Sequence, residues 1–236
     1  MRSSLSAPRH RGSIERDATA RANWRCAMMR SSELVDCSTI RSPVRAIVVG
    51  QTFRVNSGLT DLSTKAEVFF ARYRYPDWLA THSRLVGRIA AALVAARRHG
   101  APPIERDLIV LAAYLHDIGR SPLVAGDPRD HTILGALILS AEGLPECGEL
   151  ARRHAIYCVL DPALAPRTDA EKLVYVADRR GGQEVESLDE RAKDTARRHP
   201  RYAAEIERAV PLAKAVEREV FATLTFGPDE LAEHVR

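Results

Sequence analysis

The sequence predicts an all-α protein in which a run of helices follows an N-terminal segment that has no core of its own. From Leu62 onward, apolar residues recur with helical spacing, and Gly and Pro residues separate the helical stretches. No alternating strand pattern and no internal repeat competes with this interpretation. Residues 1–60 are rich in Ser and Arg. Their apolar run at 46–49 is too short to offset the entropy lost on ordering, so we expect this segment to be disordered.

The first part of the helical region is expected to contain three helices. A short amphipathic helix at 66–73 ends before a proline, and a longer one at 77–99 ends before a glycine. The third helix, 104–118, is apolar nearly all round between 108 and 115, so it is expected to be buried. The loop that follows, 120–130, is long enough to border a substrate pocket.

Further helices are expected after this loop. Asp130 is expected to cap the first of them, and Ser187 with Glu190 has the spacing of a capping box. Pro211 is expected to bend or divide the helix that contains it. The expected ranges are 131–142, 145–158, 169–179, 187–199, 201–221 and a last short helix that begins at Pro228.

The central stretch, 111–120, reads LAAYLHDIGR and places an imidazole beside a carboxylate. Its apolar first turns predict a buried helix that carries His116 and Asp117 at its C-terminal end. Gly119 is expected to end this helix in a left-handed conformation. Because the C-terminal end of a helix carries partial negative charge, a cation is favoured there. A metal site is therefore the first hypothesis.

Four further residues with metal-binding side chains accompany this pair. His82 precedes it on another predicted helix, and Asp178 lies on a later one, where taken alone it would pair with a neighbouring arginine. His131 and His154 lie between, on two more predicted helices. Together with 116–117, this ordered set resembles the HD superfamily of metal-dependent phosphohydrolases, in the subgroup with the signature His-Asp-Ile-Gly.

The resemblance implies a fold and a division of the chain. It covers roughly residues 77–195 and implies an HD-domain helical bundle, which we place at 61–200. The disordered basic segment 1–60 would precede this bundle, and a C-terminal helical extension at 201–236 would pack on it. A chain of 236 residues is long enough for one well-buried domain with such additions.

The resemblance also implies a metal centre. It assigns His82, His116, Asp117 and Asp178 to one divalent ion. Two imidazoles and two carboxylates suit Mn, Fe, Co, Ni or Zn and tolerate Mg. Positions would remain open for water and a phosphate oxygen, and the ion would lower the pKa of the water to give a nucleophile at neutral pH.

Two alternative roles are open for His131 and His154. In either role, these histidines and Asp117 are expected to be the catalytic residues. In relatives with two metal ions, histidines at these positions bind the second ion and the aspartate bridges. In one-metal enzymes they would instead hydrogen-bond the scissile phosphate. Many two-metal relatives have a His-His pair, whereas here Ala155 follows His154. Arg120 stands where many relatives have lysine, and its guanidinium offers a bidentate fork for substrate phosphate.

Three functions are compatible with this pattern. The first is hydrolysis of a phosphate ester, by a phosphomonoesterase or phosphodiesterase, with a nucleotide or dinucleotide as substrate. The second is a regulatory module that binds a nucleotide without turnover, and the third is a nuclease acting on RNA or DNA. The complete ligand set argues against the second, and only the basic N-terminal segment supports the third. The Gly-Tyr-Pro signature of the cyclic-di-GMP phosphodiesterases in the superfamily is absent.

Composition favours a cytoplasmic protein with a small phosphorylated substrate. The formal charge is +4, but residues 1–30 carry seven arginines against two acidic residues, so the remainder is slightly acidic. We therefore expect neither nucleic acid nor a membrane as a partner, although an Arg-rich, Ser-rich N-terminus is also typical of a transit peptide. No apolar run approaches the ~20 residues of a membrane span. The four cysteines show no metal-binding spacing and are expected to be free thiols.

Overall fold

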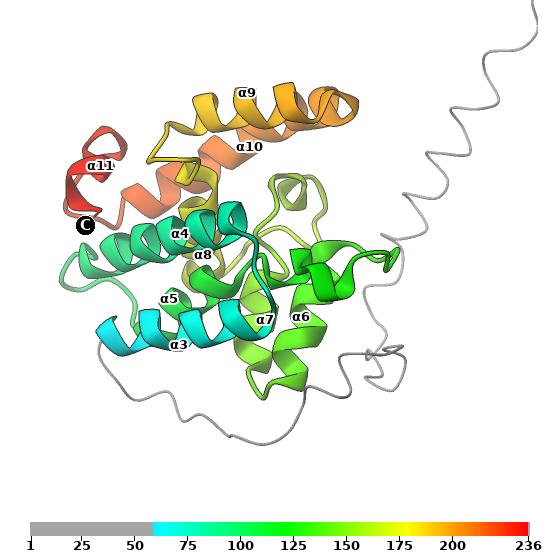
Figure 1. Ribbon diagram of the computed structural model, residues 1–236. Helices are drawn as coiled ribbons and strands as arrows, with labels where there is room; N and C mark the ends of the chain where they lie inside the picture. The colour runs from blue at the N-terminus through cyan, green and yellow to red at the C-terminus, as the bar shows by residue number, and fades with distance from the viewer. Residues whose placement is uncertain (1–58, 236) are drawn as a thin grey trace, which may run out of the picture. The chain divides into compact units, whose positions relative to one another are not determined.

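The computed structural model describes residues 59–235, and in this range the protein is all-α as predicted (Figure 1). Pairing of the β type is limited in this range to isolated bridges at Arg97–Leu224 and Gly181–Val185. The segment expected to be disordered lies outside the described residues, except that the first helix already begins at Leu59. The α-helices are α3 (Leu59–Arg72), α4 (Asp77–Ala95), α5 (Arg106–Leu115), α6 (His131–Ala141), α7 (Pro145–Ala151), α8 (Asp169–Arg180), α9 (Leu188–Arg198), α10 (Ala203–Phe221) and α11 (Leu231–His234).

Helix α5 forms the centre of the core, as its apolar composition predicts. Every residue from Ile109 to Leu115 is buried, because α3, α4, α7 and α8 all pack against this short helix. The two residues after it, His116 and Asp117, therefore lie in the interior. The apolar residues of α4 and α8 complete the same core.

The C-terminal helices contact the central bundle at several points. Helix α10 packs against α8 and α9, and α11 contacts α4 (Figure 1). Arg180 at the end of α8 donates hydrogen bonds to Glu217 Oε1 on α10, at 2.8 Å, and to the backbone oxygen of Pro228, at 2.8 Å. These contacts are of the kind expected for an extension that packs on the bundle, while the domain boundaries at 61–200 and 201–236 remain predictions.

Two helices end earlier than the sequence predicts. Helix α4 ends at Ala95 instead of residue 99, because the backbone N–H of Arg98 donates to Thr223 O at 2.9 Å and the chain turns toward the C-terminal segment. The helix expected at 145–158 is α7 followed by a separate 3-10 helix, η4 (Ile156–Leu160), so His154 lies in the turn between them.

The expected ends of the central helix also need correction. Helix α5 ends at Leu115, and a short 3-10 helix, η2 (Ile118–Arg120), follows the turn at His116 and Asp117. Gly119 is not left-handed, since the glycines with positive φ in the described range are elsewhere. Gly119 instead lies directly against the backbone of α6. Helix α10 runs unbroken through Pro211, so the helix is not divided there, while the alternative of a bend stays a prediction.

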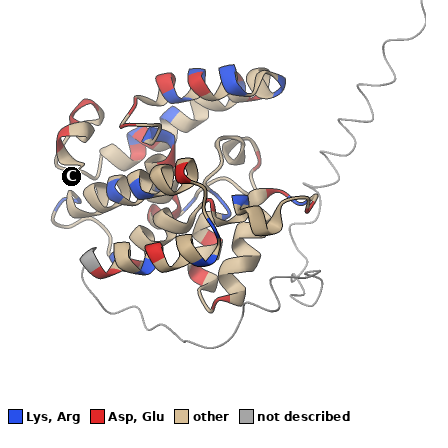
Figure 2. Ribbon diagram, viewed as in Figure 1, with Lys and Arg blue, Asp and Glu red and all other residues tan. Residues whose placement is uncertain are grey.

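Charged residues of both signs are interspersed along the described helices, most visibly on α9 (Figure 2). Among residues 59–235, no helix has both the length and the apolar character required to cross a bilayer.

Two predicted helix starts are confirmed. Asp130 accepts a hydrogen bond from Thr132 N at 2.8 Å, and Ser187 with Glu190 forms a capping box.

Candidate metal centre

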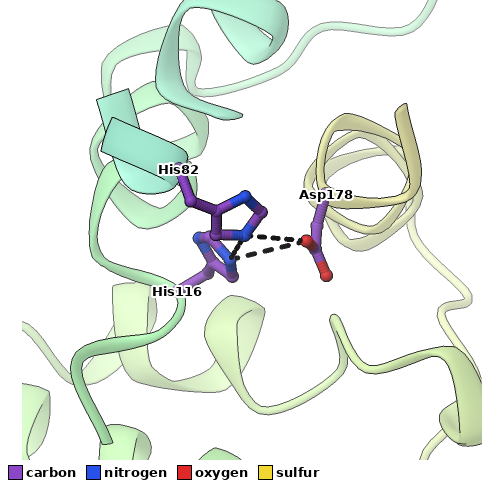
Figure 3. A group of neighbouring side chains, drawn as sticks. All are labelled: His82, His116 and Asp178. Carbon is purple, nitrogen blue, oxygen red and sulfur yellow. Dashed lines mark hydrogen bonds and ion pairs between the residues drawn. The ribbon is translucent and has the colours of Figure 1, made fainter. Parts of the chain in front are cut away.

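Three side chains from different parts of the bundle point toward one another in its interior (Figure 3). His82 comes from α4, His116 follows α5, and Asp178 comes from the last turns of α8. The Nε2 atoms of the two histidines are 3.2 Å apart. Asp178 Oδ1 lies 3.2 Å from Nε2 of His82 and 3.6 Å from Nε2 of His116. Separations of this size bring all three donor atoms within reach of one cation.

Asp117 joins this group and also faces a second one. Its Oδ2 lies 3.7 Å from Nε2 of His116 and 3.9 Å from Nε2 of His82. Its Oδ1 lies 3.2 Å from Nε2 of His154 and 3.5 Å from Nε2 of His131. The two oxygens of one carboxylate therefore serve the two sets of histidines that the sequence singles out.

Close packing between η2 and α6 brings one histidine of the second set, His131 at the start of α6, to Asp117. A Cβ atom on Gly119 would lie only 2.0 Å from the backbone oxygen of His131 and 2.6 Å from the backbone nitrogen of Gly135. Only glycine allows the turn after Asp117 to approach the first turns of α6 so closely. The conformation predicted for Gly119 is wrong, but a glycine is required here because of this close approach.

The backbone fixes the orientation of two imidazoles. Nδ1 of His116 lies 2.7 Å from Ala113 O, and Nδ1 of His154 lies 2.5 Å from Ala151 O. Because a carbonyl oxygen only accepts, both Nδ1 atoms donate, and in the neutral ring the lone pair is then on Nε2. Those Nε2 atoms face the centre. Hydrogen bonds of this kind orient histidine ligands in metal proteins.

The environment sets the charge of the carboxylates and of His116. Burial is the largest influence on Asp117 and Asp178 and by itself would raise the pKa of each carboxyl group. Arg120 beside Asp117, Arg179 beside Asp178 and the nearby imidazoles outweigh it, and the pKa of both groups is held well below its usual range. Burial lowers the pKa of His116 to about 3. Two charged carboxylates and a neutral imidazole are the protonation states that metal coordination requires.

The two remaining histidines shift in opposite directions. Burial and the neighbouring Arg120 lower the pKa of His131. Burial acts in the same direction on His154, but the Asp117 carboxylate outweighs it and raises the pKa of that imidazole. His131 also places Nδ1 3.3 Å from Asp130 Oδ1, so the cap of α6 orients its ring as well.

The donor set fits a divalent metal ion. Two overlapping groups, His82–His116–Asp178 and His116–Asp117–His154, each offer ligand atoms that lie within 4.8 Å of one another, and all five side chains are buried. The set combines imidazole nitrogen with carboxylate oxygen and contains no thiolate. Such a mixture suits the middle and later first-row divalent ions. The structure thus brings together all six residues expected at the site, while the role of each residue remains a proposal.

Two arginines that lie close in sequence to expected metal ligands, Arg120 and Arg84, have different surroundings. Arg120 donates from Nε to Asp117 Oδ1 at 2.8 Å, and its side chain is 43 % exposed. Arg84 forms an exposed ion pair with Glu67 at 2.6 Å. Of these two arginines, only Arg120 therefore combines contact with the centre and access from solvent.

Sequence patterns did not single out two neighbours of the centre. Arg179 is buried and forms an ion pair with Asp178, which the sequence offered only as an alternative to metal binding. Tyr75 has a buried hydroxyl with no hydrogen-bond partner among the described residues, and Asp117 contributes to the raised pKa of this phenol. Arg179 could have been found from its place beside Asp178. Nothing in the sequence marks Tyr75, because its approach to Asp117 depends on the turn before α4.

Comparison with protein families finds a match to the HD domain over residues 79–181. The matched range includes all six residues of the centre. Neither the curated proteins nor the solved structures contain a match to this chain. HD domains bind divalent metals and are generally metal-dependent phosphohydrolases. The match over residues 79–181 confirms the resemblance to the HD superfamily that the sequence predicts.

Proposed function

We propose that the protein hydrolyses a phosphate ester, with a nucleotide or dinucleotide as its substrate class. The observation that carries the proposal is the convergence of His82, His116, Asp117 and Asp178, whose donor atoms lie 3.2 to 3.9 Å apart in the pairs given above. These four residues would hold at least one divalent cation. The nucleotide itself is inferred from the family and is the part of the proposal that a substrate panel has to decide.

The chemistry divides between the cation and the chain. A bound divalent ion would polarise the phosphoryl group and lower the pKa of a coordinated water. The protein orients the ligands through backbone hydrogen bonds to His116 and His154. It also keeps Asp117 and Asp178 ionised at neutral pH, as their lowered pKa values indicate.

Arg120 supports the phosphoryl group in this proposal. Its Nε is occupied by Asp117, while the exposed part of the guanidinium retains N–H donors that can reach a phosphate oxygen. Guanidinium donors match the geometry of phosphate oxygens and remain charged at any physiological pH. The complete set of ligands beside this arginine favours turnover over a binding module without catalysis.

A matched pair of aspartate variants tests the function. Asp117→Ala removes the carboxylate shared by both histidine groups and is expected to abolish both metal binding and hydrolysis. Asp127→Ala is the control, because that carboxylate pairs with Arg129 outside the centre. Elemental analysis and a panel of p-nitrophenyl esters, nucleotides and dinucleotides with added Mn²⁺ give the readouts. Retention of metal and activity in Asp117→Ala would show that the site has been misplaced.

Single histidine variants separate the two roles that the sequence left open. If His131 or His154 contacts the phosphoryl group, replacement by alanine lowers turnover and leaves the metal content unchanged. If either binds a second ion, the metal content falls with turnover. RNA and DNA oligonucleotides in the same panel test the nuclease alternative, which no feature of the described residues supports.

A further inference from the structure

The second group of donors at Asp117 is where a second metal ion would have to bind. It consists of Asp117 Oδ1 and the Nε2 atoms of His131 and His154, which are 3.3 Å apart. The first group, around His82 and Asp178, uses the other oxygen of the same carboxylate. The number of ions therefore depends on whether the second group is free to coordinate.

Arg120 already binds two of these three atoms. Its Nε lies 2.8 Å from Asp117 Oδ1, and its Nη2 lies 2.9 Å from Nε2 of His131. A guanidinium has only donors, so His131 must present its Nε2 lone pair to Arg120. This fits the other side of the ring, where Nδ1 faces the Asp130 carboxylate at 3.3 Å. A lone pair engaged by an N–H group is not available to a metal ion at the same time.

The charge at the centre also disfavours a second metal ion. The carboxylates of Asp117 and Asp178 are matched by the guanidiniums of Arg120 and Arg179, which form ion pairs with them. One divalent ion would leave the group positive, which favours a phosphate anion. A second ion beside Asp117 Oδ1 would lie next to the Arg120 guanidinium, whose positive charge would repel it.

We infer that Arg120 takes the place of a second metal ion, so that this centre binds a single divalent cation at His82, His116, Asp117 and Asp178. The inference rests on the proposed function and specifies its metal stoichiometry. It assigns His131 to the positioning of Arg120, through the bond between Nε2 and Nη2. The guanidinium supplies fixed positive charge where a dinuclear centre would use its second ion.

Replacement of Arg120 tests this directly. Arg120→Met keeps an unbranched side chain but removes the charge and both hydrogen bonds, so the donors of Asp117, His131 and His154 become free. After equilibrium dialysis against Mn²⁺, we expect one ion per chain in the wild type and two in Arg120→Met. The double variant Arg120→Met with His131→Ala should return to one, because it lacks a ligand of the second ion. Arg120→Lys, which keeps the charge, should also bind one.

Two further measurements complete the experiment. Arg129→Met is the matched control, since Arg129 lies in the same loop but pairs with Asp127, and it should bind one ion. Electron paramagnetic resonance should show an isolated Mn²⁺ signal in the wild type and an exchange-coupled pair in Arg120→Met. Circular dichroism verifies that each variant is folded.

The possible results separate this inference from the proposed function. Two ions in the wild type, or one ion in a folded Arg120→Met, would overturn the inference and leave the hydrolase proposal intact. A wild-type chain that binds no Mn²⁺ would overturn both.

Discussion

The contact between η2 and α6 contains one glycine from each element, and replacing each glycine by alanine tests how closely the two elements pack. Gly119 and Gly135 face each other across it. A Cβ on Gly119 would lie 2.0 Å from His131 O, whereas a Cβ on Gly135 would meet its nearest neighbour, Gly119 N, at 3.5 Å. The first distance is a severe clash with backbone and the second is an ordinary contact. The same Gly→Ala change should therefore have opposite effects at the two positions.

The magnitudes follow from the atoms involved. Overpacking costs typically about 1–3 kcal/mol, and a clash with backbone cannot be relieved by a rotamer change, so we expect about 3 kcal/mol for Gly119→Ala. For a chain of this size that corresponds to a Tm lower by about 6–12 °C. Gly135→Ala lies inside helix α6 and should instead stabilise the protein by about 0.5–1 kcal/mol.

The clash should also reach the candidate site. To accept the new methyl group, α6 would have to move away from η2 by about 1 Å, and it would take His131 away from Asp117 and Arg120. A displacement of this size can reduce turnover about 100-fold. Calorimetry and hydrolysis of the best substrate in the panel measure both effects. A Gly119→Ala protein with unchanged Tm and turnover, or a Gly135→Ala protein that is equally destabilised, would refute the reasoning.

Three other predictions concern stability. Tyr73→Phe removes the hydrogen bond to Glu142 at 2.7 Å and should lower the unfolding free energy by about 1 kcal/mol in urea titrations; no change would mean that the bond makes no net contribution. Burial raises the thiol pKa of Cys147 and Cys158 from 9.0 to about 12, so the native state holds protons that the unfolded chain releases above pH 9. The unfolding free energy should therefore fall as pH rises from 9 to 12, by about 1.4 kcal/mol per pH unit for each thiol, and replacing either cysteine by alanine should reduce this slope. Pro211 is exposed within α10, so Pro211→Ala should raise the unfolding free energy by about 2 kcal/mol, and a lower Tm would contradict this.

Local patterns were sufficient for most of the secondary structure. The period of the apolar residues located α5 and α8, and short polar motifs located the caps at Asp130 and Ser187, because both signals arise from residues within one or two turns of each other. The errors occurred where contacts with distant segments determine the end of a helix. Helix α4 ends early because residues near 98 and 223 bond to each other, and η4 separates from α7 in a region where it packs against α10.

The sequence by itself determined that the protein is helical, and it singled out the six side chains that the fold brings together at the centre. It could not determine how they are shared between metal, phosphate and protein. Only the tertiary structure placed the two oxygens of Asp117 toward different histidines and Arg120 against His131. The physical reason is that these contacts join segments far apart in the chain, and those of His131 depend on how closely η2 approaches α6. That approach is set by backbone packing around Gly119, and no spacing along the chain encodes it.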